Sequence, residues 1–223
     1  GMKTLVFTSL FALLAMLMPV DKKKKIVFFG DSITEAGIMP GGYIRRIDSM
    51  LNGRGMGEQF ELVGAGISGN KIYDLFLRMQ TDVLDAKPDI VVIYIGVNDV
   101  WHKRLAGTGT DADRFERFYN AILKKLAAEN IKAIICTPAV IGERTDFSNE
   151  QDGELNNYCT IIRRIAATHK TPLADLRKAF LDYNLKNNPG NRESGILTTD
   201  RVHLNAAGNQ LVADEMLKVI LAL

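Results

Sequence analysis

The stretch Ile26-Val27-Phe28-Phe29-Gly30-Asp31-Ser32-Ile33-Thr34 is the most informative part of the chain. Its first four residues are apolar and either β-branched or aromatic, which predicts a buried parallel strand, and Gly-Asp-Ser predicts a sharp turn after it. A serine there lies at the carboxyl end of a strand, where open α/β sheets bind ligands. Gly, Asp and Ser also favour ordinary turns, so this stretch alone does not separate a functional serine from a turn residue.

Further apolar runs follow the first, and segments with helical spacing of apolar residues separate them. Strands are expected at 60–63, 90–95, 131–136 and 172–174, helices at 43–51, 72–79, 111–129, 151–167, 176–185 and 206–223, and long loops at 100–110 and 187–199. This alternation predicts an α/β fold, a three-layer α/β/α sandwich with a five-stranded parallel sheet in the flavodoxin-like order 2-1-3-4-5. That order brings the ends of the first three strands together.

Size and composition predict one globular domain at 26–223, preceded by a leader at 1–25. The 223 residues include 28 Lys and Arg against 26 Asp and Glu, but without the leader 23 basic residues face 25 acidic ones. Such a body offers no electrostatic footprint for nucleic acid. Cys136 and Cys159 form neither a disulfide framework nor a metal-ligand cluster, and we interpret both as buried thiols. No metal and no organic cofactor is expected.

The leader resembles the core of a secretory signal. Leu5–Val20 is an almost unbroken apolar run, too short for a comfortable membrane span. The cluster Lys22–Lys25 after it opposes translocation, and no small-x-small cleavage site is evident. We expect export, periplasmic or secreted, or membrane association through an uncleaved leader. Packing of the leader on a second subunit would instead make a homodimer.

Four segments carry residues suited to acyl-transfer chemistry. Serine is a weak nucleophile that needs a general base, commonly a histidine oriented by a carboxylate. Asp200 lies three residues before His203, so one turn of backbone could fold the carboxylate onto the ring Nδ1–H and leave Nε2 for Ser32. By contrast, His169 ends a helix and is interpreted as a surface or capping residue. His102, in the loop after the third strand, is interpreted as a pocket wall.

A tetrahedral intermediate also needs donors for its oxyanion. The backbone N–H groups of Ser32 and Gly69, with the side-chain amide of Asn98, could meet at one point. Gly69 would let the backbone approach closely because it has no Cβ. Taken singly, Gly69 is equally typical of a turn glycine and Asn98 of a turn or cap residue.

Together these segments resemble the GDSL/SGNH hydrolase family across residues 26–220. The matching blocks, in the family's order, are Gly30-Asp31-Ser32-Ile33, Ile67-Ser68-Gly69, Gly96-Val97-Asn98-Asp99 and Asp200-x-x-His203. The departure is Ile33 where the family has Leu. The resemblance implies a three-layer α/β/α fold and hydrolysis of esters and thioesters by a Ser-His-Asp mechanism. It makes Ser32 the nucleophile, His203 the base and Asp200 its orienting acid, with Ser32, Gly69 and Asn98 as oxyanion donors.

Two other classes of function stay open at this point. Gly64–Gly69 matches the G-x-G-x-x-G fingerprint of nicotinamide or flavin enzymes, between a strand and a helix. That fingerprint needs an acidic residue about twenty positions on, at the far end of the next strand. Asp89 begins that strand and Asp99 is too distant, which counts against this class. The other class is a non-catalytic binding module, which the filled triad and oxyanion positions disfavour.

The substrate is not encoded in the motifs and must depend on the surrounding loops. Trp101, His102 and Arg104 would form an aromatic and basic rim that suits a polar alcohol such as a sugar, although Trp101 could equally pack a loop. The other loops that would shape the pocket are at 36–42, 138–153 and 187–199. We expect short acyl groups, such as acetyl, on a carbohydrate or other polar alcohol. Relatives of similar length also include lipases and lysophospholipases, so that activity is the alternative.

Overall fold

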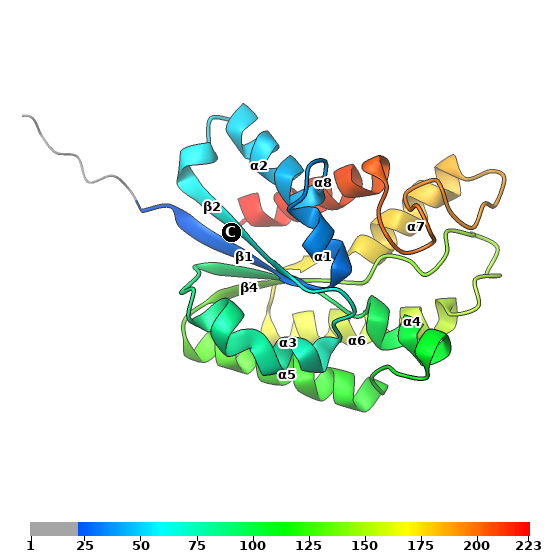
Figure 1. Cartoon of the computed structure of the whole chain (residues 1–223), viewed down its shortest axis with the longest axis horizontal. Coiled ribbons are helices and arrows are strands. Elements are labelled where there is room, and N and C mark those ends of the chain that lie inside the picture. Colours follow the sequence, from blue (N-terminus) through cyan, green and yellow to red (C-terminus); the bar gives the residue numbers. More distant parts are fainter. Residues whose placement is uncertain (1–21) are drawn as a thin grey trace, which may run out of the picture.

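The structure, a computed structural model, describes residues 22–223, in which strands and helices alternate (Figure 1). Most of the predicted leader lies outside this range. The elements in chain order are β1 Lys24–Gly30, α1 Ser32–Gly37, α2 Tyr43–Gly53, η1 Gly57–Gln59, β2 Phe60–Gly66, α3 Ile72–Met79, η2 Gln80–Leu84, β3 Ile90–Tyr94, α4 Val97–Ala106, α5 Ala112–Ala128, β4 Lys132–Cys136, α6 Asp152–His169, β5 Leu173–Ala174, α7 Leu176–Asn187 and α8 Ala206–Leu221.

The sheet confirms the predicted topology. Its five parallel strands lie in the order β2-β1-β3-β4-β5. Figure 1 shows α1, α2, α7 and α8 on one face of the sheet and α3, α5 and α6 on the other, which makes the predicted three-layer sandwich. Because β1 lies between β2 and β3, the carboxyl ends of these three strands share one edge of the sheet.

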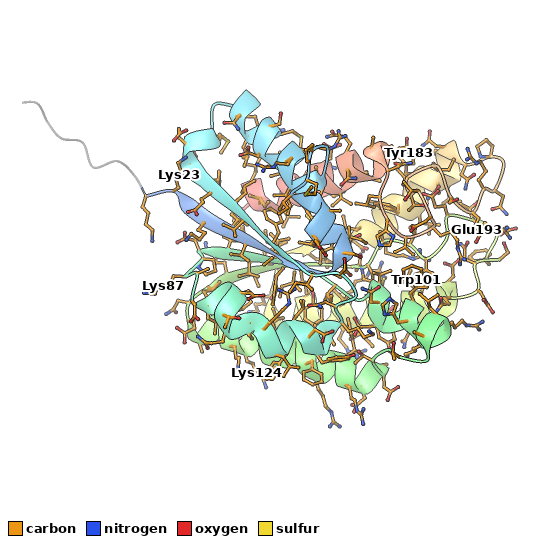
Figure 2. All side chains as sticks on the ribbon, viewed as in Figure 1. Lys23, Lys87, Trp101, Lys124, Tyr183 and Glu193 are labelled. Atoms are coloured by element: carbon orange, nitrogen blue, oxygen red, sulfur yellow. The ribbon has the colours of Figure 1, made fainter. Side chains whose placement is uncertain are left out.

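The core forms where the sequence is continuously apolar. The four residues Ile26, Val27, Phe28 and Phe29 are at most 1% exposed, as a strand covered by helices on both faces requires. Most charged side chains lie outside this core, and Figure 2 shows Lys23, Lys87 and Lys124 at the surface. Both cysteines are buried free thiols, and burial raises the pKa of each. Both are therefore poorly reactive.

The predicted loop at 100–110 is wrong, because the helix α4 runs from Val97 to Ala106. Its signals are local and easily missed. Asp99 lies in the first turn and Lys103 in the last, which suits the helix dipole. Gly107 ends the helix in the left-handed conformation, at φ 64°. The buried residues of α4 are the four consecutive ones at its start, Val97 to Val100, so spacing of apolar residues does not reveal the helix.

Two other differences lie at the ends of strands. β1 begins at Lys24, so the last two lysines of the predicted leader pair with β2 in the sheet. After the strand, the expected turn is the short helix α1, capped by the Asp31 carboxylate, which accepts a hydrogen bond from the N–H of Ile33 at 2.9 Å. Asn205 caps α8 as predicted, accepting from the N–H of Gly208 at 3.0 Å.

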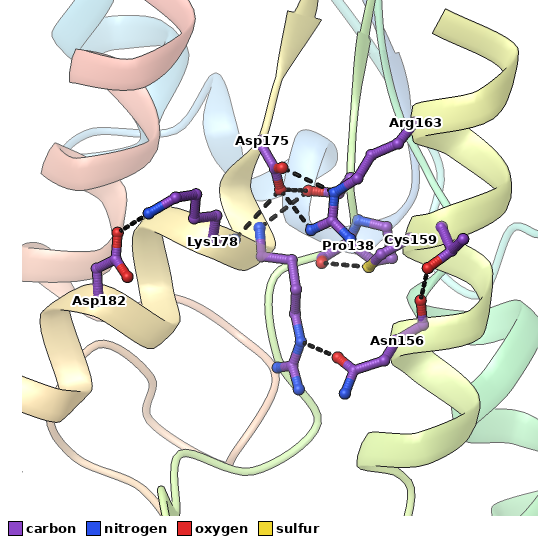
Figure 3. Close-up of polar contacts among 10 residues, drawn as sticks. Pro138, Asn156, Cys159, Arg163, Asp175, Lys178 and Asp182 are labelled. Atoms are coloured by element: carbon purple, nitrogen blue, oxygen red, sulfur yellow. Dashed lines mark hydrogen bonds and ion pairs between the residues drawn. The ribbon is translucent and has the colours of Figure 1, made fainter. Parts of the chain in front are cut away.

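Helix α7 is held to α6 by buried and half-buried polar contacts (Figure 3). Arg163 of α6 donates to both carboxylate oxygens of Asp175 at 2.8 and 2.9 Å, and Asp175 in turn caps α7. The buried Arg177 donates to Asn156 at 2.9 Å and to Asp152 at 3.0 Å. These contacts join α6 to the start of α7, directly after β5. Among residues 22–223, no helix has the length and apolar character needed to cross a membrane.

Candidate active site

Ser32 begins α1, directly after the carboxyl end of β1. Two glycines allow close packing there: Gly30 lets the end of β1 lie against β3, and Gly66 lets β2 lie against the start of α1. A Cβ atom at Gly30 would lie 2.5 Å from the carbonyl oxygen of Tyr94, and one at Gly66 would lie 2.7 Å from that of Asp31. Because a larger side chain at either position would force the backbone apart, the close packing of β1, β2 and β3 fixes where Ser32 emerges.

The structure brings Ser32, His203 and Asp200 together in one chain of hydrogen-bonding groups. The Oγ of Ser32 lies 3.0 Å from Nε2 of His203, and Nδ1 of His203 lies 2.6 Å from the Asp200 carboxylate. Ser32 and His203 are 171 positions apart in sequence. The carboxylate of Asp200 can therefore orient the imidazole so that its other nitrogen faces the serine hydroxyl.

Asp200 is itself held by its neighbours in the loop before α8. Its Oδ1 accepts hydrogen bonds from the backbone N–H groups of Val202 at 3.1 Å and His203 at 2.8 Å. Partial burial acts to raise the pKa of Asp200, but the hydrogen bonds from the His203 ring and from these two N–H groups outweigh it, so the pKa lies below its usual value. The carboxylate is therefore ionised at neutral pH and can stabilise an imidazolium.

Gly69 and Asn98 lie on the segments that follow β2 and β3, the two neighbours of β1. Gly69 has φ +78°, a conformation that other residues rarely adopt, and the space where a Cβ would stand is empty. Asn98 is 2% exposed, and its Nδ2 donates to the carbonyl oxygen of Asn70 at 3.1 Å. One of the two amide hydrogens of Asn98 is engaged there, which leaves the second for another acceptor.

Two buried carboxyls that we did not predict as functional residues lie beside the motif residues. Asp31 is 2% exposed and Asp99 is fully buried. Burial raises the pKa of Asp31 to about 7 and that of Asp99 to about 6, and the charge of Asp99 adds to the shift at Asp31. The Asp99 carboxylate accepts from the N–H of Ile72 at 3.1 Å, which ties the start of α3 to α4. The sequence signal that could have marked Asp31 and Asp99 as site residues is their position inside the motifs Gly30-Asp31-Ser32 and Asn98-Asp99.

The three predicted rim residues all lie on α4, but they do not act as one group. The ring of Trp101 stands edge-on to the ring of His203, with centroids 6.1 Å apart, and Figure 2 marks Trp101 at that end of the molecule. His102 lies beside Trp101, and partial burial together with the charge of Lys71 lowers the pKa of His102. Arg104 forms an ion pair with Glu150 in the loop before α6. Trp101 is therefore the rim residue nearest the serine and histidine.

A buried glutamate outside every predicted motif supports the loop that carries Asp200 and His203. Glu143 is 1% exposed, and its carboxylate accepts from the N–H groups of Ile196 at 2.8 Å and Leu197 at 2.6 Å. No spacing or composition signal marks Glu143 in the polar loop after β4, which is why sequence reasoning missed it.

His169, the remaining histidine, lies at a helix end, and the described residues form no metal-binding cluster. His169 is the last residue of α6, and its Nε2 lies 2.6 Å from Oδ1 of Asn120, in agreement with the predicted helix-end role. Within the part of the chain that the structure describes, no three His, Cys, Asp or Glu side chains gather in an arrangement that could hold a metal ion.

The sequence matches a known family and a characterised relative over most of its length. The GDSL-like Lipase/Acylhydrolase family model matches residues 28–211. An acetylxylan esterase from Geobacillus stearothermophilus is 30% identical over 221 residues, covering 91% of this chain and 96% of the relative.

Solved structures give the same result. The crystal structure of the acetyl xylan esterase AlAXEase is 60% identical, with a TM-score of 0.87 over 88% of this chain and 99% of that one. A structure of Axe2, an acetylxylan esterase from G. stearothermophilus, is 27% identical, with a TM-score of 0.79 over 91% of this chain and 96% of the other. It is a catalytic mutant with an aspartate replaced by alanine, and further catalytic mutants of Axe2 replace a histidine or a serine. The chain described here belongs to the GDSL-like lipase/acylhydrolase family and is a carboxylic ester hydrolase.

Proposed function

We propose that the protein is a serine esterase that removes acetyl groups from a carbohydrate, with Ser32 as nucleophile, His203 as general base and Asp200 as the group that orients His203. The observation that carries this proposal is the contact of 3.0 Å between Ser32 Oγ and His203 Nε2, continued at 2.6 Å to the Asp200 carboxylate. A serine so placed can lose its proton as it attacks a carbonyl carbon.

The reaction follows from the positions of these groups. Ser32 Oγ attacks the ester carbonyl while His203 takes its proton, and the carbonyl oxygen becomes an oxyanion near the N–H groups of Ser32 and Gly69 and the amide of Asn98. The ester C–O bond then breaks, and His203 returns the proton to the departing sugar hydroxyl. Water, deprotonated by His203, attacks the acetyl-serine, and acetate leaves as Ser32 regains its proton. The chain's own residues perform each of these steps.

Similarity to acetylxylan esterases supports the choice of a carbohydrate acetyl ester. In this chain, the side chain that supports it is Trp101, whose ring stands next to the imidazole of His203. An indole at that position could pack against the apolar face of a sugar ring. The glycines of Gly64–Gly69 have structural roles in this site, because Gly66 packs against the start of α1 and Gly69 has a positive φ. A nucleotide is not needed to explain them.

A panel of esters tests the substrate class. We expect release of acetate from acetylated xylooligosaccharides, and kcat/KM that falls steadily along p-nitrophenyl esters from acetate to laurate. Preference for laurate would favour the lipase or lysophospholipase alternative, and no acetate released from the sugars would contradict the proposal.

Replacing the proposed nucleophile, Ser32→Ala, tests the mechanism. The Ser49→Ala variant, in an exposed helix position, is the control for Ser32→Ala. The first should retain wild-type rates, and the second should lose turnover by several orders of magnitude.

Export of the protein by the leader at 1–25 is part of the same proposal. The support is the apolar run Leu5–Val20, which has the length of a signal-sequence core. Fractionation of cells, followed by N-terminal sequencing of the mature protein, checks it, and full-length protein confined to the cytosol would contradict it. Contact of the leader with a membrane or with a second subunit remains a prediction.

A further inference from the structure

Arg78, on α3, reaches back across the carboxyl ends of two strands toward the candidate site. Its Nη2 donates to the carbonyl oxygens of Gly30 at 2.8 Å and Ala65 at 2.9 Å, the first at the end of β1 and the second near the end of β2. The guanidinium carbon also stands 4.6 Å from the centre of the Phe29 ring. The side chain is 14% exposed, so these contacts are largely screened from water.

The same guanidinium also holds the segment that carries Gly69. Nε of Arg78 donates to Oδ1 of Asn70 at 2.7 Å. The backbone carbonyl of Asn70 in turn accepts from Nδ2 of Asn98 at 3.1 Å. Asn98 has two amide hydrogens on one planar group, so the bond to Asn70 fixes the direction of the second hydrogen. The position of Asn70 therefore sets where Asn98 can donate.

An arginine suits this place better than a lysine. Its planar fork offers five N–H donors in fixed directions, whereas an ammonium group is a single point charge with rotatable donors. Here the fork meets four acceptors at once, since Nη1 also donates to Asp82 at 2.7 Å. One rigid group thus connects the turn before Ser32 with the loop that carries Gly69 and Asn70.

We propose that Arg78 is a positioning residue of this ester hydrolase, which acts through Asn70 to orient the amide of Asn98 toward the oxyanion. The inference rests on the proposed function, because it takes Asn98 as an oxyanion donor. Arg78 itself does not contact substrate. Its effect should therefore be on the rate of the chemical step and not on substrate binding.

The first test compares Arg78→Lys with wild type on p-nitrophenyl acetate. We expect kcat to fall by about 10- to 100-fold with KM changed by about twofold or less, since small misplacement of a transition-state donor costs rate more than binding. Arg177→Lys is the matched control, because Arg177 is at least as well shielded from water as Arg78 and also makes several hydrogen bonds, but to residues after β4 and on α6. It should lower the melting temperature and leave kcat unchanged.

Asn70→Ala separates the proposed route from a general loss of folding. It removes the acceptor for Arg78 Nε and leaves the bonds of Arg78 to Gly30 and Ala65 in place, so it should lower kcat in the same way even if Arg78→Lys folds poorly. In a double-mutant cycle, Arg78→Lys added to Asn98→Ala should cost no more than about twofold beyond Asn98→Ala alone. Unchanged kcat in folded Arg78→Lys and Asn70→Ala would overturn the inference. So would a double variant whose loss of kcat equals the product of the losses in Arg78→Lys and Asn98→Ala.

The Ser32→Ala variant keeps this inference distinct from the proposed function. Wild-type turnover by Ser32→Ala would remove the proposed function and the inference with it. If Ser32→Ala is inactive while folded Arg78→Lys and Asn70→Ala are fully active, the proposed function stands and only the role of Arg78 is wrong.

Discussion

At the level of single residues, the hydrogen bond that Asp200 accepts from the His203 ring decides which imidazole nitrogen carries the proton. Asp200 accepts from the His203 ring and from two backbone N–H groups, so its position is fixed by the loop itself. A carboxylate in this place requires the proton of the neutral imidazole to be on Nδ1. Nε2 then has a free lone pair facing Ser32.

Asp200→Asn should lower kcat by about 10⁴-fold, because an amide can stabilise the wrong imidazole tautomer and cannot balance an imidazolium. KM should change little, and the fold should be intact by circular dichroism. Steady-state kinetics on p-nitrophenyl acetate measure this, with Asp182→Asn on the exposed face of α7 as the control. Turnover of Asp200→Asn close to that of wild type would remove Asp200 from the mechanism.

At the level of elements, the loop that carries Asp200 and His203 depends on a contact from a different segment. Glu143, in the loop after β4, accepts from two successive backbone N–H groups at Ile196 and Leu197. The carbonyl of Leu197 then accepts from the N–H of Asn205, the residue that caps α8. The buried carboxylate thus anchors the loop six and seven residues before His203.

Glu143→Gln should cost about 1–3 kcal/mol of unfolding free energy, because one of two buried backbone donors loses its acceptor. It should also reduce kcat, since the loop bearing His203 is less well fixed. Glu193→Gln is the control in the same region, where half-exposed ion pairs contribute about 1 kcal/mol or less. Chemical denaturation and kinetics check both variants. Equal stability of Glu143→Gln and Glu193→Gln would contradict the anchoring role.

The elements also mark the limit of what the sequence could predict. β1 and β3 are predictable because buried parallel strands are continuous apolar runs, and the motif residues follow them directly. α4 was missed because its buried residues, Val97 to Val100, are consecutive and overlap a motif, so they show no helical spacing. Arg78 and Glu143 were missed for another reason. The carboxylate of Glu143 contacts only backbone N–H groups more than fifty positions away, and Arg78 contacts the carbonyls of Gly30 and Ala65 and the side chain of Asn70, none of which a sequence motif links to it.

At the level of the whole molecule, the buried acids beside the site give stability a pH dependence. The folded-state pKa of Asp31 is raised to about 7 and that of Asp99 to about 6, mainly by burial. Between about pH 4 and pH 7 the folded chain therefore binds more protons at these groups than the unfolded chain does, and the contribution of these groups to stability decreases as pH rises.

Asp31→Asn should flatten this dependence. The amide keeps an oxygen for the N–H of Ile33 and carries no charge that burial would penalise. Urea denaturation at pH 5 and pH 7 measures the difference, and wild type should lose more stability between the two values than Asp31→Asn does. Asp48→Asn, on the half-exposed face of α2, serves as the control. The same slope in wild type and Asp31→Asn would contradict the assignment of a raised pKa to Asp31.

Covalent labelling with a fluorophosphonate, located by mass spectrometry of peptides, tests the central claim most directly. A serine with an accessible hydroxyl next to a free imidazole nitrogen attacks such a probe, and an ordinary serine does not. The account predicts one adduct per chain, on Ser32, formed much more slowly in His203→Ala. An adduct at another residue, or ester hydrolysis that persists with Ser32 unlabelled, would contradict it.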